Sequence, residues 1–462
     1  MGCSGASRVR VRAAGVCDRV AHAGSLRGRL FVRRDLIHWV IEGGASFLGG
    51  AVVRISAIRL ALVVSHPIQY FVPLYRRLAR RSDMILKVFF TWHVGKAAVE
   101  DRGFKQAVSW DIPMTEGYPF ELVPNISHRP GTHRFLGLHN PALVERVTAW
   151  KPDVVQVTGW AWLSHLQALH ALQRRGVPTL FRGDSHLLDG KPSGMHGGIK
   201  RRLLQRVFSW PAGFLVVGSA NAEYYKYFGV DAARLYPCVH SIDVERFAEP
   251  ADALEQQARD WRARLEIRSE QKVLLFAGKF EAKKRPVDLM EAVLRLPVEN
   301  VMLVLVGAGE LQAEIDRIAA AHPQRFRVLP FQNQSRMPIV YRLGDLVVLF
   351  SGYGETWGLA VNEALACGRP VLVSDRVGCA ADVVDRGCGR VIAWNDFAAL
   401  DRAVTELMNG DVLLGMRRTA AERAWRFDVA VTEAQLVQAV ERVCELAYAH
   451  VGEAPVHAHQ AR

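Results

Sequence analysis

The chain has 462 residues, a length that suits two α/β domains and an extension, and half of its residues are hydrophobic, as in soluble enzymes. No run of eighteen or more apolar residues occurs, which argues against a membrane-spanning helix. The net charge is +13, and the seven cysteines are scattered without a C-x-x-C pair. This cysteine pattern argues against disulfides and zinc ligands and predicts reduced thiols in the cytoplasm.

The first 58 residues form a basic segment without clear hydrophobic periodicity. They hold nine arginines and three acidic residues. Such a composition predicts a disordered extension over residues 1–58. Two other interpretations stay open, an Arg-rich transit peptide and an over-extended translation start.

Candidate strands with helical patterns between several of them predict a Rossmann-like α/β domain over residues 59–235. The strands are 60–64, 85–89, 154–157, 179–181 and 214–217. Ligands bind such sheets at the carboxyl ends of their strands. Polar residues follow two of these ends: His66 and Gln69 after the first strand, and Asp184 and His186 after the fourth.

A basic and apolar mixture marks residues 199–210. Lys200, Arg201, Arg202 and Arg206 alternate with aliphatic and aromatic residues. An interfacial helix uses this mixture on anionic lipid, so the segment predicts a peripheral contact with the inner face of a membrane. The alternative is an ordinary amphipathic helix that packs on the sheet.

The second half shows clearer strand, glycine-loop and helix units, which predict a second Rossmann-like domain over residues 269–425. Residues 236–268 are predicted as the linker, and residues 426–462 as a C-terminal helix and tail. The strands of this domain are 273–277, 301–306, 346–350 and 370–373. Gly307 and Gly309 follow the second strand, but Gln312 stands where a dinucleotide-binding fingerprint needs a small residue, which argues against a dehydrogenase.

Four cations follow the strand 273–277, namely Lys279, Lys283, Lys284 and Arg285. Like charges crowd together only at an electrostatic cost, so this cluster predicts that a polyanion such as a diphosphate neutralises them. The alternative is a solvated charge run at the start of a helix.

The run GYGETWGLAVNEALACGRPVLVSD, residues 352–375, places Glu355 and Glu363 with seven residues between them across a loop-to-helix junction. Backbone amides near Gly358 and Leu359, at the start of that helix, can point at a pyrophosphate. Glu363 lies about one turn further along the same face, where its carboxylate can accept hydrogen bonds from a ribose diol. The alternative is an exposed helix with unpaired surface carboxylates.

This run resembles the E-x7-E signature of retaining glycosyltransferases with the GT-B fold, in particular family 4. The segment from Gly278 to Lys284 resembles the G-R-x4-K element of that family, with Lys279 in place of the usual Arg. The resemblance is strong in the second half of the chain and weak in the first. It implies two Rossmann-like, doubly wound α/β domains that face a cleft.

The resemblance also implies roles for single residues. In such enzymes the first Glu contacts the transferred sugar and the second the nucleotide ribose, which assigns these roles to Glu355 and Glu363. The diphosphate is assigned to Lys279 and Lys284 together with the helix-start amides of Gly358 and Leu359, and the base to Phe331. His66 and Gln69 stand where the family usually has a glycine-rich loop, so we expect them to bind acceptor hydroxyls instead. Many family members have a histidine at the position of Asp184, and we expect Asp184 or His186 at the reacting centre. Phe331 as a core residue, and 184–186 as a loop that hydrogen-bonds itself, are the alternatives.

The sequence therefore predicts a retaining, metal-independent glycosyltransferase that moves a sugar from a nucleoside diphosphate to a hydroxyl of a glycan or lipid-linked glycan. It needs no cofactor beyond its nucleotide-sugar substrate, and it is predicted to be cytoplasmic and to bind no nucleic acid. The base, the sugar and the acceptor stay open. The alternatives are a catalytically silent assembly partner and a basic nucleic-acid-binding protein.

Overall fold

The computed structural model describes residues 28–33, 36–41, 57–93, 99–101, 103–296, 300–408 and 410–452. Two units can be separated, Met1–Ala57 and Ile58–Arg462. In the first unit, β1 (Gly28–Arg33) pairs antiparallel with β2 (Leu36–Ile41). We expected no regular element in residues 1–58, and most of this range lies outside the described residues.

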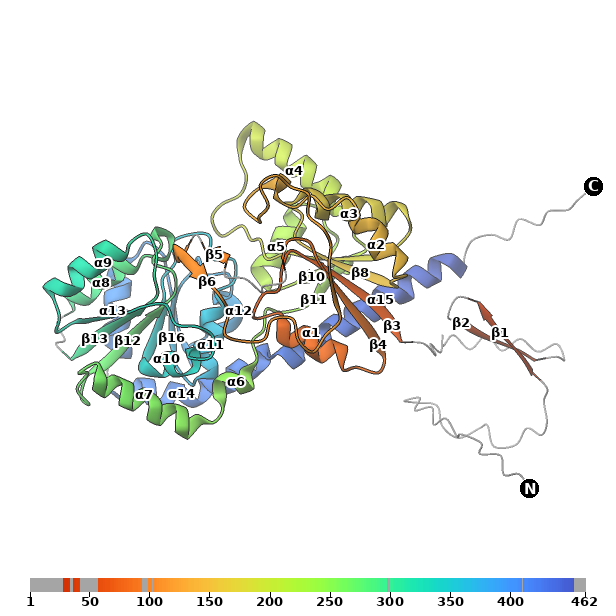
Figure 1. The fold of residues 1–462 in the computed structure, drawn as a ribbon. Helices are drawn as coiled ribbons and strands as arrows, with labels where there is room; N and C mark the ends of the chain where they lie inside the picture. Colours follow the sequence, from red (N-terminus) through yellow and green to blue (C-terminus); the bar gives the residue numbers. More distant parts are fainter. Residues whose placement is uncertain are drawn as a thin grey trace, which may run out of the picture. The chain divides into compact units, whose positions relative to one another are not determined.

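The first sheet of the larger unit is parallel, with the strand order β11-β10-β9-β8-β3-β4-β7 (Figure 1). Leu60 and Leu62 of β3 pack in one hydrophobic cluster, and Ala61 and Val63 pack in another. Alternate residues of a strand point to opposite faces, so both faces of this sheet are covered. The strands are β3 (Ile58–Val64), β4 (Met84–Phe90), β7 (Phe120–Leu122), β8 (Val154–Thr158), β9 (Thr179–Arg182), β10 (Gly213–Val216) and β11 (Leu235–Pro237).

The helices of this domain cross between its strands. They are α1 (Val72–Ala79), α2 (Leu143–Ala149), α3 (Leu163–Arg174), α4 (Gly194–Phe208) and α5 (Ser219–Tyr227), with the short 3-10 turns η1 (Phe135–Gly137) and η2 (Ala232–Arg234). A small antiparallel hairpin, β5 (Val99–Asp101) and β6 (Gln106–Val108), is inserted between β4 and β7.

The second sheet is also parallel, with the order β14-β13-β12-β15-β16-β17. Its strands are β12 (Lys272–Ala277), β13 (Val301–Val306), β14 (Phe326–Leu329), β15 (Leu346–Leu349), β16 (Val371–Ser374) and β17 (Gly389–Ile392). Its helices and turns are η3 (Ala282–Lys284), α8 (Pro286–Arg295), α9 (Gln312–Ala321), α10 (Met337–Leu343), α11 (Leu359–Ala366), α12 (Ala380–Val383), α13 (Phe397–Leu407) and α14 (Gly410–Ala424). Two Rossmann-like α/β domains are thus present, which confirms the predicted fold class.

The chain crosses between the two domains twice, and the crossings lie side by side. The first leads from β11 to α6 (Val244–Ala248) and α7 (Ala251–Arg264), and the second from η4 (Trp425–Phe427) to α15 (Val429–Gly452). Ile242 and Asp428 form a bridge where the crossings meet. Helix α15, drawn in blue in Figure 1, returns to pack against α1 and β11 of the first domain.

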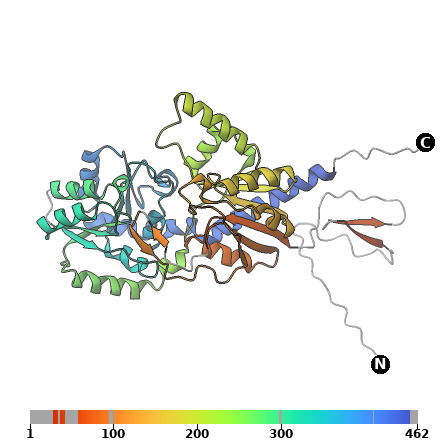
Figure 2. The same cartoon turned by 45° about the horizontal axis from the view of Figure 1, so that its top comes forward.

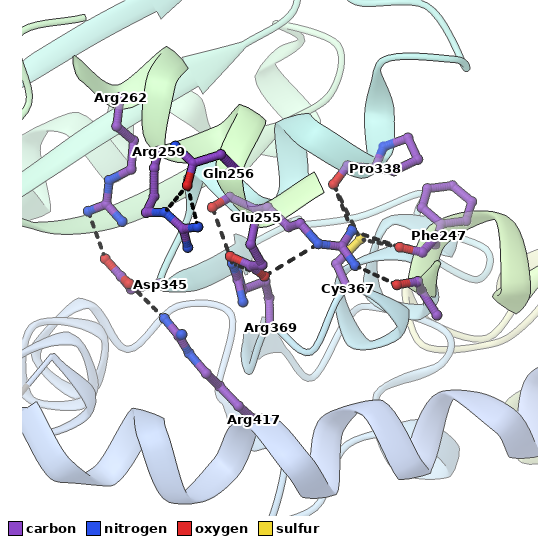
Figure 3. A network of polar contacts seen from close by, with 12 residues as sticks. Phe247, Glu255, Gln256, Arg259, Arg262, Pro338, Asp345, Cys367, Arg369 and Arg417 are labelled. Atoms are coloured by element: carbon purple, nitrogen blue, oxygen red, sulfur yellow. Dashed lines mark hydrogen bonds and ion pairs between the residues drawn. The ribbon is translucent and has the colours of Figure 1, made fainter. Parts of the chain in front are cut away.

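A network of ion pairs joins elements of the second domain, and Figure 3 shows Asp345 between Arg262 and Arg417. The Asp345 carboxylate, before β15, accepts hydrogen bonds from Arg262 of α7 at 3.1 Å, from Arg417 of α14 at 3.0 Å and from the Val273 amide of β12 at 2.9 Å. Burial opposes ionisation of Asp345, but Arg262 and the Val273 amide outweigh it and lower the pKa of this carboxyl. The network therefore ties two helices to the sheet through one carboxylate.

The described cysteines are buried, and Cys238, Cys367, Cys379 and Cys388 are free thiols. Cys3 and Cys17 lie outside the described residues. Among the helices that the structure describes, none is long and apolar enough to cross a membrane.

Candidate functional site

A cavity of about 680 Å³ lies between the two domains of the larger unit. Residues that follow β3 and β4 line it from the first domain, and residues that follow β12, β13 and β14 line it from the second. Its size is typical of small-molecule sites, and its place at the carboxyl ends of parallel strands is where α/β folds bind ligands. Many predicted site residues line it together: His66, Gln69, Lys279, Lys284, Phe331, Leu359 and Glu363.

Glu363 lies on α11, which begins at Leu359 as the sequence predicted. The Tyr341 hydroxyl donates a hydrogen bond to Glu363 Oε2 at 2.6 Å. Burial raises the pKa of Glu363, although the hydrogen bond from Tyr341 opposes this effect. The carboxylate therefore faces the cavity with one oxygen already held by a tyrosine.

Glu355 lies on the loop before α11 and pairs with Lys284. The Glu355 Oε2 to Lys284 Nζ distance is 2.6 Å, and the two side chains are only 15% and 16% exposed. The Ser351 hydroxyl donates to the same carboxylate at 3.0 Å. Burial opposes ionisation here too, but Lys284 outweighs it, so the pKa of Glu355 is lowered.

We predicted that a polyanion neutralises the cations after β12, and this stays a prediction. Carboxylates from their own turn and from other elements pair with all of them, so electrostatic crowding alone gives no argument for a bound polyanion. A phosphate that binds one of these lysines would have to replace the carboxylate that pairs with it. The pairs are Lys279 with Asp101 at 2.7 Å, Lys283 with Glu281 at 3.2 Å, Lys284 with Glu355, and Arg285 with Asp288 at 2.7 Å.

Gly358 precedes α11 in the left-handed region, with φ at +95°. A Cβ atom at this position would come within 2.8 Å of both Leu349 and Val377. Only glycine fits this turn, which brings the first residues of the helix, Leu359 and Ala360, to the cavity wall.

Imidazole and indole rings of the first domain form a cluster on the side of the cavity where we predicted the acceptor. His66 stacks on His93 with ring centres 5.1 Å apart and meets Trp92 edge-on at 5.2 Å. Its Nδ1 lies 2.9 Å from the Ser65 hydroxyl. Burial, with a smaller contribution from His93, lowers the pKa of His66 to about 4, so this imidazole is neutral at pH 7.

Asp184 and His186 reach the loop that carries Glu355, although neither lines the cavity. Thr356 Oγ1 donates to Asp184 Oδ2 at 2.8 Å, and His186 Nε2 donates to the Glu355 carbonyl at 3.1 Å. His186 Nδ1 accepts a hydrogen bond from the Leu188 amide at 3.2 Å, so both ring nitrogens contact the backbone. The two side chains hold the Glu355 loop in place, and their part at the reacting centre stays a prediction.

The cavity also contains residues that the sequence did not identify. Asp101, Phe104 and Trp110 come from the β5–β6 insertion, and Tyr341 comes from α10. Both strands of the insertion have three residues, too few for a periodic pattern. Phe331 lies against Phe104, with ring centres 4.6 Å apart, and is half-buried at the cavity wall.

The described residues include no group of three or more His, Cys, Asp or Glu side chains placed to hold a metal ion. The residues that line the cavity offer lysines, carboxylates and helix-start amides that can surround an anion, with neutral hydrogen-bonding groups opposite.

Comparisons with known proteins cover both halves of the chain. A family described as Glycosyl transferases group 1 matches residues 257–426. The D-inositol 3-phosphate glycosyltransferase of Mycobacterium marinum is 31% identical over 378 residues, which are 76% of this chain and 78% of that protein. The enzyme of the same description from Mycolicibacterium smegmatis is 28% identical over 207 residues, 44% of this chain and 47% of its own length, so that match spans about half of the relative.

Solved structures show the same arrangement of domains. Anabaena HepE in complex with UDP and glucose superimposes with a TM-score of 0.60, at 16% sequence identity, and the match covers 83% of this chain and 100% of that chain. At this identity the likeness concerns the fold, that of two Rossmann-like domains about a cleft.

Proposed function

We propose a reaction for this chain, which belongs to the group 1 glycosyl transferases of the GT-B fold, family 4. The chain moves a sugar from a nucleoside diphosphate to an acceptor hydroxyl, and the transferred sugar retains its anomeric configuration. The observation that carries the proposal is the convergence of Lys279, Lys284, Leu359 and Glu363 on one cavity. These residues come from two separate strand-to-helix junctions of the second domain. Together they offer cations, helix-start amides and a half-buried carboxylate, which suit the parts of a nucleoside diphosphate.

The roles that we propose are those that the family resemblance implies, and the place of Lys279, Lys284 and Glu363 at the cavity supports them. Lys279, Lys284 and the α11 amides bind the diphosphate, Glu363 accepts hydrogen bonds from the ribose, and Glu355 contacts the sugar. The acceptor oxygen forms its bond to the anomeric carbon as the bond from that carbon to the phosphate oxygen breaks. The leaving diphosphate keeps that electron pair and takes the acceptor's proton on the same face, while the lysines stabilise its charge. The reaction as proposed needs no metal.

The acceptor side of the cavity suits hydroxyl groups. His66 is neutral at pH 7, so its imidazole can act as a hydrogen-bond partner without adding a charge, and Gln69 offers an amide beside it. Phosphorylated inositol is the acceptor in the relatives' names, whereas here the class proposed is a glycan or a lipid-linked glycan.

Helix α4 supports a peripheral membrane contact as part of the same proposal. Leu204, Val207 and Phe208 are buried in the core of the first domain, as the packed-helix alternative predicted. The apolar residues of the opposite face point outward, with Met195, Ile199 and Leu203 exposed by 77%, 60% and 50%. The helix projects from its domain in both views (Figures 1 and 2).

The charges on α4 support an anionic membrane as the surface that this face contacts. Lys200, Arg201, Arg202 and Arg206 are exposed, and the helix contains no acidic residue. Aliphatic residues spaced at i, i+4 and i+8 beside such cations match an anionic phospholipid bilayer, which brings a lipid-linked acceptor close to the cavity.

A thermal-shift series with UDP, GDP, ADP and dTDP tests the proposed donor class. A ligand at 100 times its dissociation constant stabilises a protein by roughly 2.7 kcal/mol, so the cognate nucleotide raises the melting temperature clearly above the other three. The Lys284→Ala variant is expected to lose most of this shift. No shift with any of the four nucleotides would contradict the proposed donor class.

A further inference from the structure

The β5–β6 hairpin of the first domain contacts the donor side of the cavity. The Asp101 carboxylate lies 2.7 Å from Lys279 Nζ, and the two side chains are 29% and 31% exposed. The ring of Phe104 lies beneath the same ammonium, 5.0 Å from its centre. A Cβ atom at Gly103 would meet Lys279 and Glu281 at 2.4 and 2.5 Å, so the hairpin packs tightly on this segment.

The turn that follows Asp101 orients its carboxylate for the contact with Lys279. Its Oδ1 atom accepts hydrogen bonds from the amides of Gly103 at 2.9 Å and Phe104 at 3.1 Å. Burial opposes ionisation, but the hydrogen bond from Lys279 and these amides outweigh it and lower the pKa of Asp101. The group is therefore an oriented anion at neutral pH.

The hairpin also covers the residue predicted to contact the base. Phe331 meets Phe104 at 4.6 Å and Trp110 at 6.3 Å between ring centres. The first domain thus places the Asp101 carboxylate against Lys279, which is assigned to the diphosphate. It also places two aromatic rings against Phe331, which is assigned to the base. An anion joined to an aromatic ring has the chemical character of a nucleoside diphosphate itself.

We propose that Asp101 is a positioning residue that sets nucleotide affinity, because a nucleoside diphosphate has to displace it from Lys279. This inference rests on the proposed function, since it assigns a diphosphate to that lysine. The apparent affinity of a ligand falls with the fraction of protein whose site is free, so a protein that spends less time in the Asp101–Lys279 contact binds nucleotide more tightly.

The test is calorimetric titration of the cognate nucleoside diphosphate, chosen from the four named above, into the full chain. Asp101→Asn keeps the shape of the side chain and removes its charge. We expect the dissociation constant of the nucleotide from this variant to be at least threefold lower than from the wild type. In the background of Lys279→Ala the same change has no effect, because the lysine that Asp101 occupies is absent. This coupling distinguishes competition from a general change of the hairpin.

Asp111→Asn is the matched control. Asp111 follows the same hairpin and accepts a hydrogen bond from the Ser335 amide at 3.1 Å, so it also joins the two domains but touches no lysine of the cavity. The dissociation constant of the nucleotide from Asp111→Asn is expected to stay within twofold of the wild-type value. A gain in Asp111→Asn equal to that in Asp101→Asn would overturn the role of Asp101.

A second readout needs no nucleotide. Acylation of Lys279 by an amine-reactive ester, followed by mass spectrometry, is expected to be faster in Asp101→Asn and unchanged in Asp111→Asn. Unchanged reactivity in Asp101→Asn, or nucleotide binding equal to or weaker than that of the wild type, overturns the inference. If wild type and Asp101→Asn both fail to bind any of the four nucleotides, the proposed function fails, and the inference that rests on it fails with it.

Discussion

The two glutamates of the E-x7-E pattern have opposite electrostatic surroundings. Burial raises the pKa of Glu363, whereas Lys284 lowers the pKa of Glu355. The sequence predicted both positions at a loop-to-helix junction. It did not predict the contact of Glu363 with Tyr341, because Tyr341 lies on another helix, α10, and only the folded chain brings the two side chains together. Local spacing therefore identified the carboxylates, and only the tertiary structure supplied their partners.

At the residue scale, Glu363→Ala is predicted to weaken nucleotide binding by roughly 1.5 to 3 kcal/mol, because a charge-assisted hydrogen bond to the ribose is lost. The wild-type affinity is also predicted to fall as the pH falls through the raised pKa of Glu363, since the carboxylate is the form present above that pKa. Calorimetry between pH 8 and pH 5 measures both effects.

Tyr341→Phe is the control for this prediction, because it removes the hydroxyl that donates to Glu363 and keeps the carboxylate. Its nucleotide affinity is expected to change less than that of Glu363→Ala. Unchanged affinity in a folded Glu363→Ala protein would remove the ribose assignment, and so would a pH dependence that Glu363→Ala retains.

The two lysines of the cavity are predicted to act on one diphosphate. Lys279→Ala and Lys284→Ala each reduce turnover strongly, and the double variant loses less than the product of the two losses, because either lysine stabilises the same developing charge. Single-turnover rates of the wild type, both single variants and the double variant measure this coupling. Strictly multiplicative losses would place the lysines at separate sites, and loss of wild-type activity in EDTA would contradict the metal-independent mechanism.

At the scale of elements, the hydrophobic strands were the most predictable part of the fold. The run 301–306 is strand β13 with the predicted bounds, and the run 60–64 is most of β3. The four edge strands of the two sheets, β7, β11, β14 and β17, were not predicted, since they are only partly buried and their apolar pattern is weaker than that of the inner strands. The β5–β6 hairpin and the contacts of Asp101 were not predicted either, because strands of three residues are too short for a periodic pattern.

Helix α4 carries exposed apolar side chains beside its cations. Replacement of Ile199 and Leu203 by Glu is expected to abolish flotation of the protein with vesicles that contain phosphatidylglycerol, because these exposed side chains would otherwise enter the lipid interface. Vesicles of phosphatidylcholine alone are expected to bind the wild type weakly, since they lack the anionic charge that the cations of α4 attract.

Leu414→Glu is the matched control for this experiment. Leu414 lies on α14 of the second domain and is 68% exposed, but it is not part of the cationic helix α4. Flotation equal to that of the wild type is expected for Leu414→Glu. Equal loss in both proteins, or flotation of the Ile199 and Leu203 variant at the wild-type level, would contradict a specific lipid surface on α4.

In the larger unit as a whole, two groups of contacts join the first domain to the second. Asp184, His186 and Asp189 of the first domain bind residues 354–356, and Asp101 and Asp111 bind residues of the second domain at Lys279 and Ser335. The sequence predicted two domains and a cleft. It could not predict which residues meet across the cleft, because such pairs depend on how the sheets face each other.

The Asp345 network predicts a pH-dependent stability. The folded pKa of Asp345 is lowered, so its contribution is present above the ordinary Asp pKa near 4 and is lost as the pH falls through the folded value. Asp345→Asn is expected to lower the free energy of unfolding by roughly 3 kcal/mol at pH 7, because it leaves Arg262 and Arg417 without their carboxylate.

Urea unfolding of Asp345→Asn and of Asp401→Asn between pH 7 and pH 3 measures this effect. Asp401 forms a partly exposed pair with Arg295, so its replacement is expected to cost about 1 kcal/mol or less. The difference between wild type and Asp345→Asn should stay constant down to about pH 4 and narrow below it. A constant difference down to pH 3, or equal losses in the two variants, would contradict the role given to Asp345.

The reaction proposed for the cavity is the transfer of a sugar from a nucleoside diphosphate with retention of configuration. Proton NMR of this reaction with the nucleotide-sugar of the cognate base, followed from the first turnovers, reports the configuration of the new bond through the anomeric coupling constant. We predict a product with the anomeric configuration of the donor, and a large loss of turnover in Glu355→Ala. An inverted anomer, or no consumption of any nucleotide-sugar by the wild type, would show that the proposed reaction is wrong.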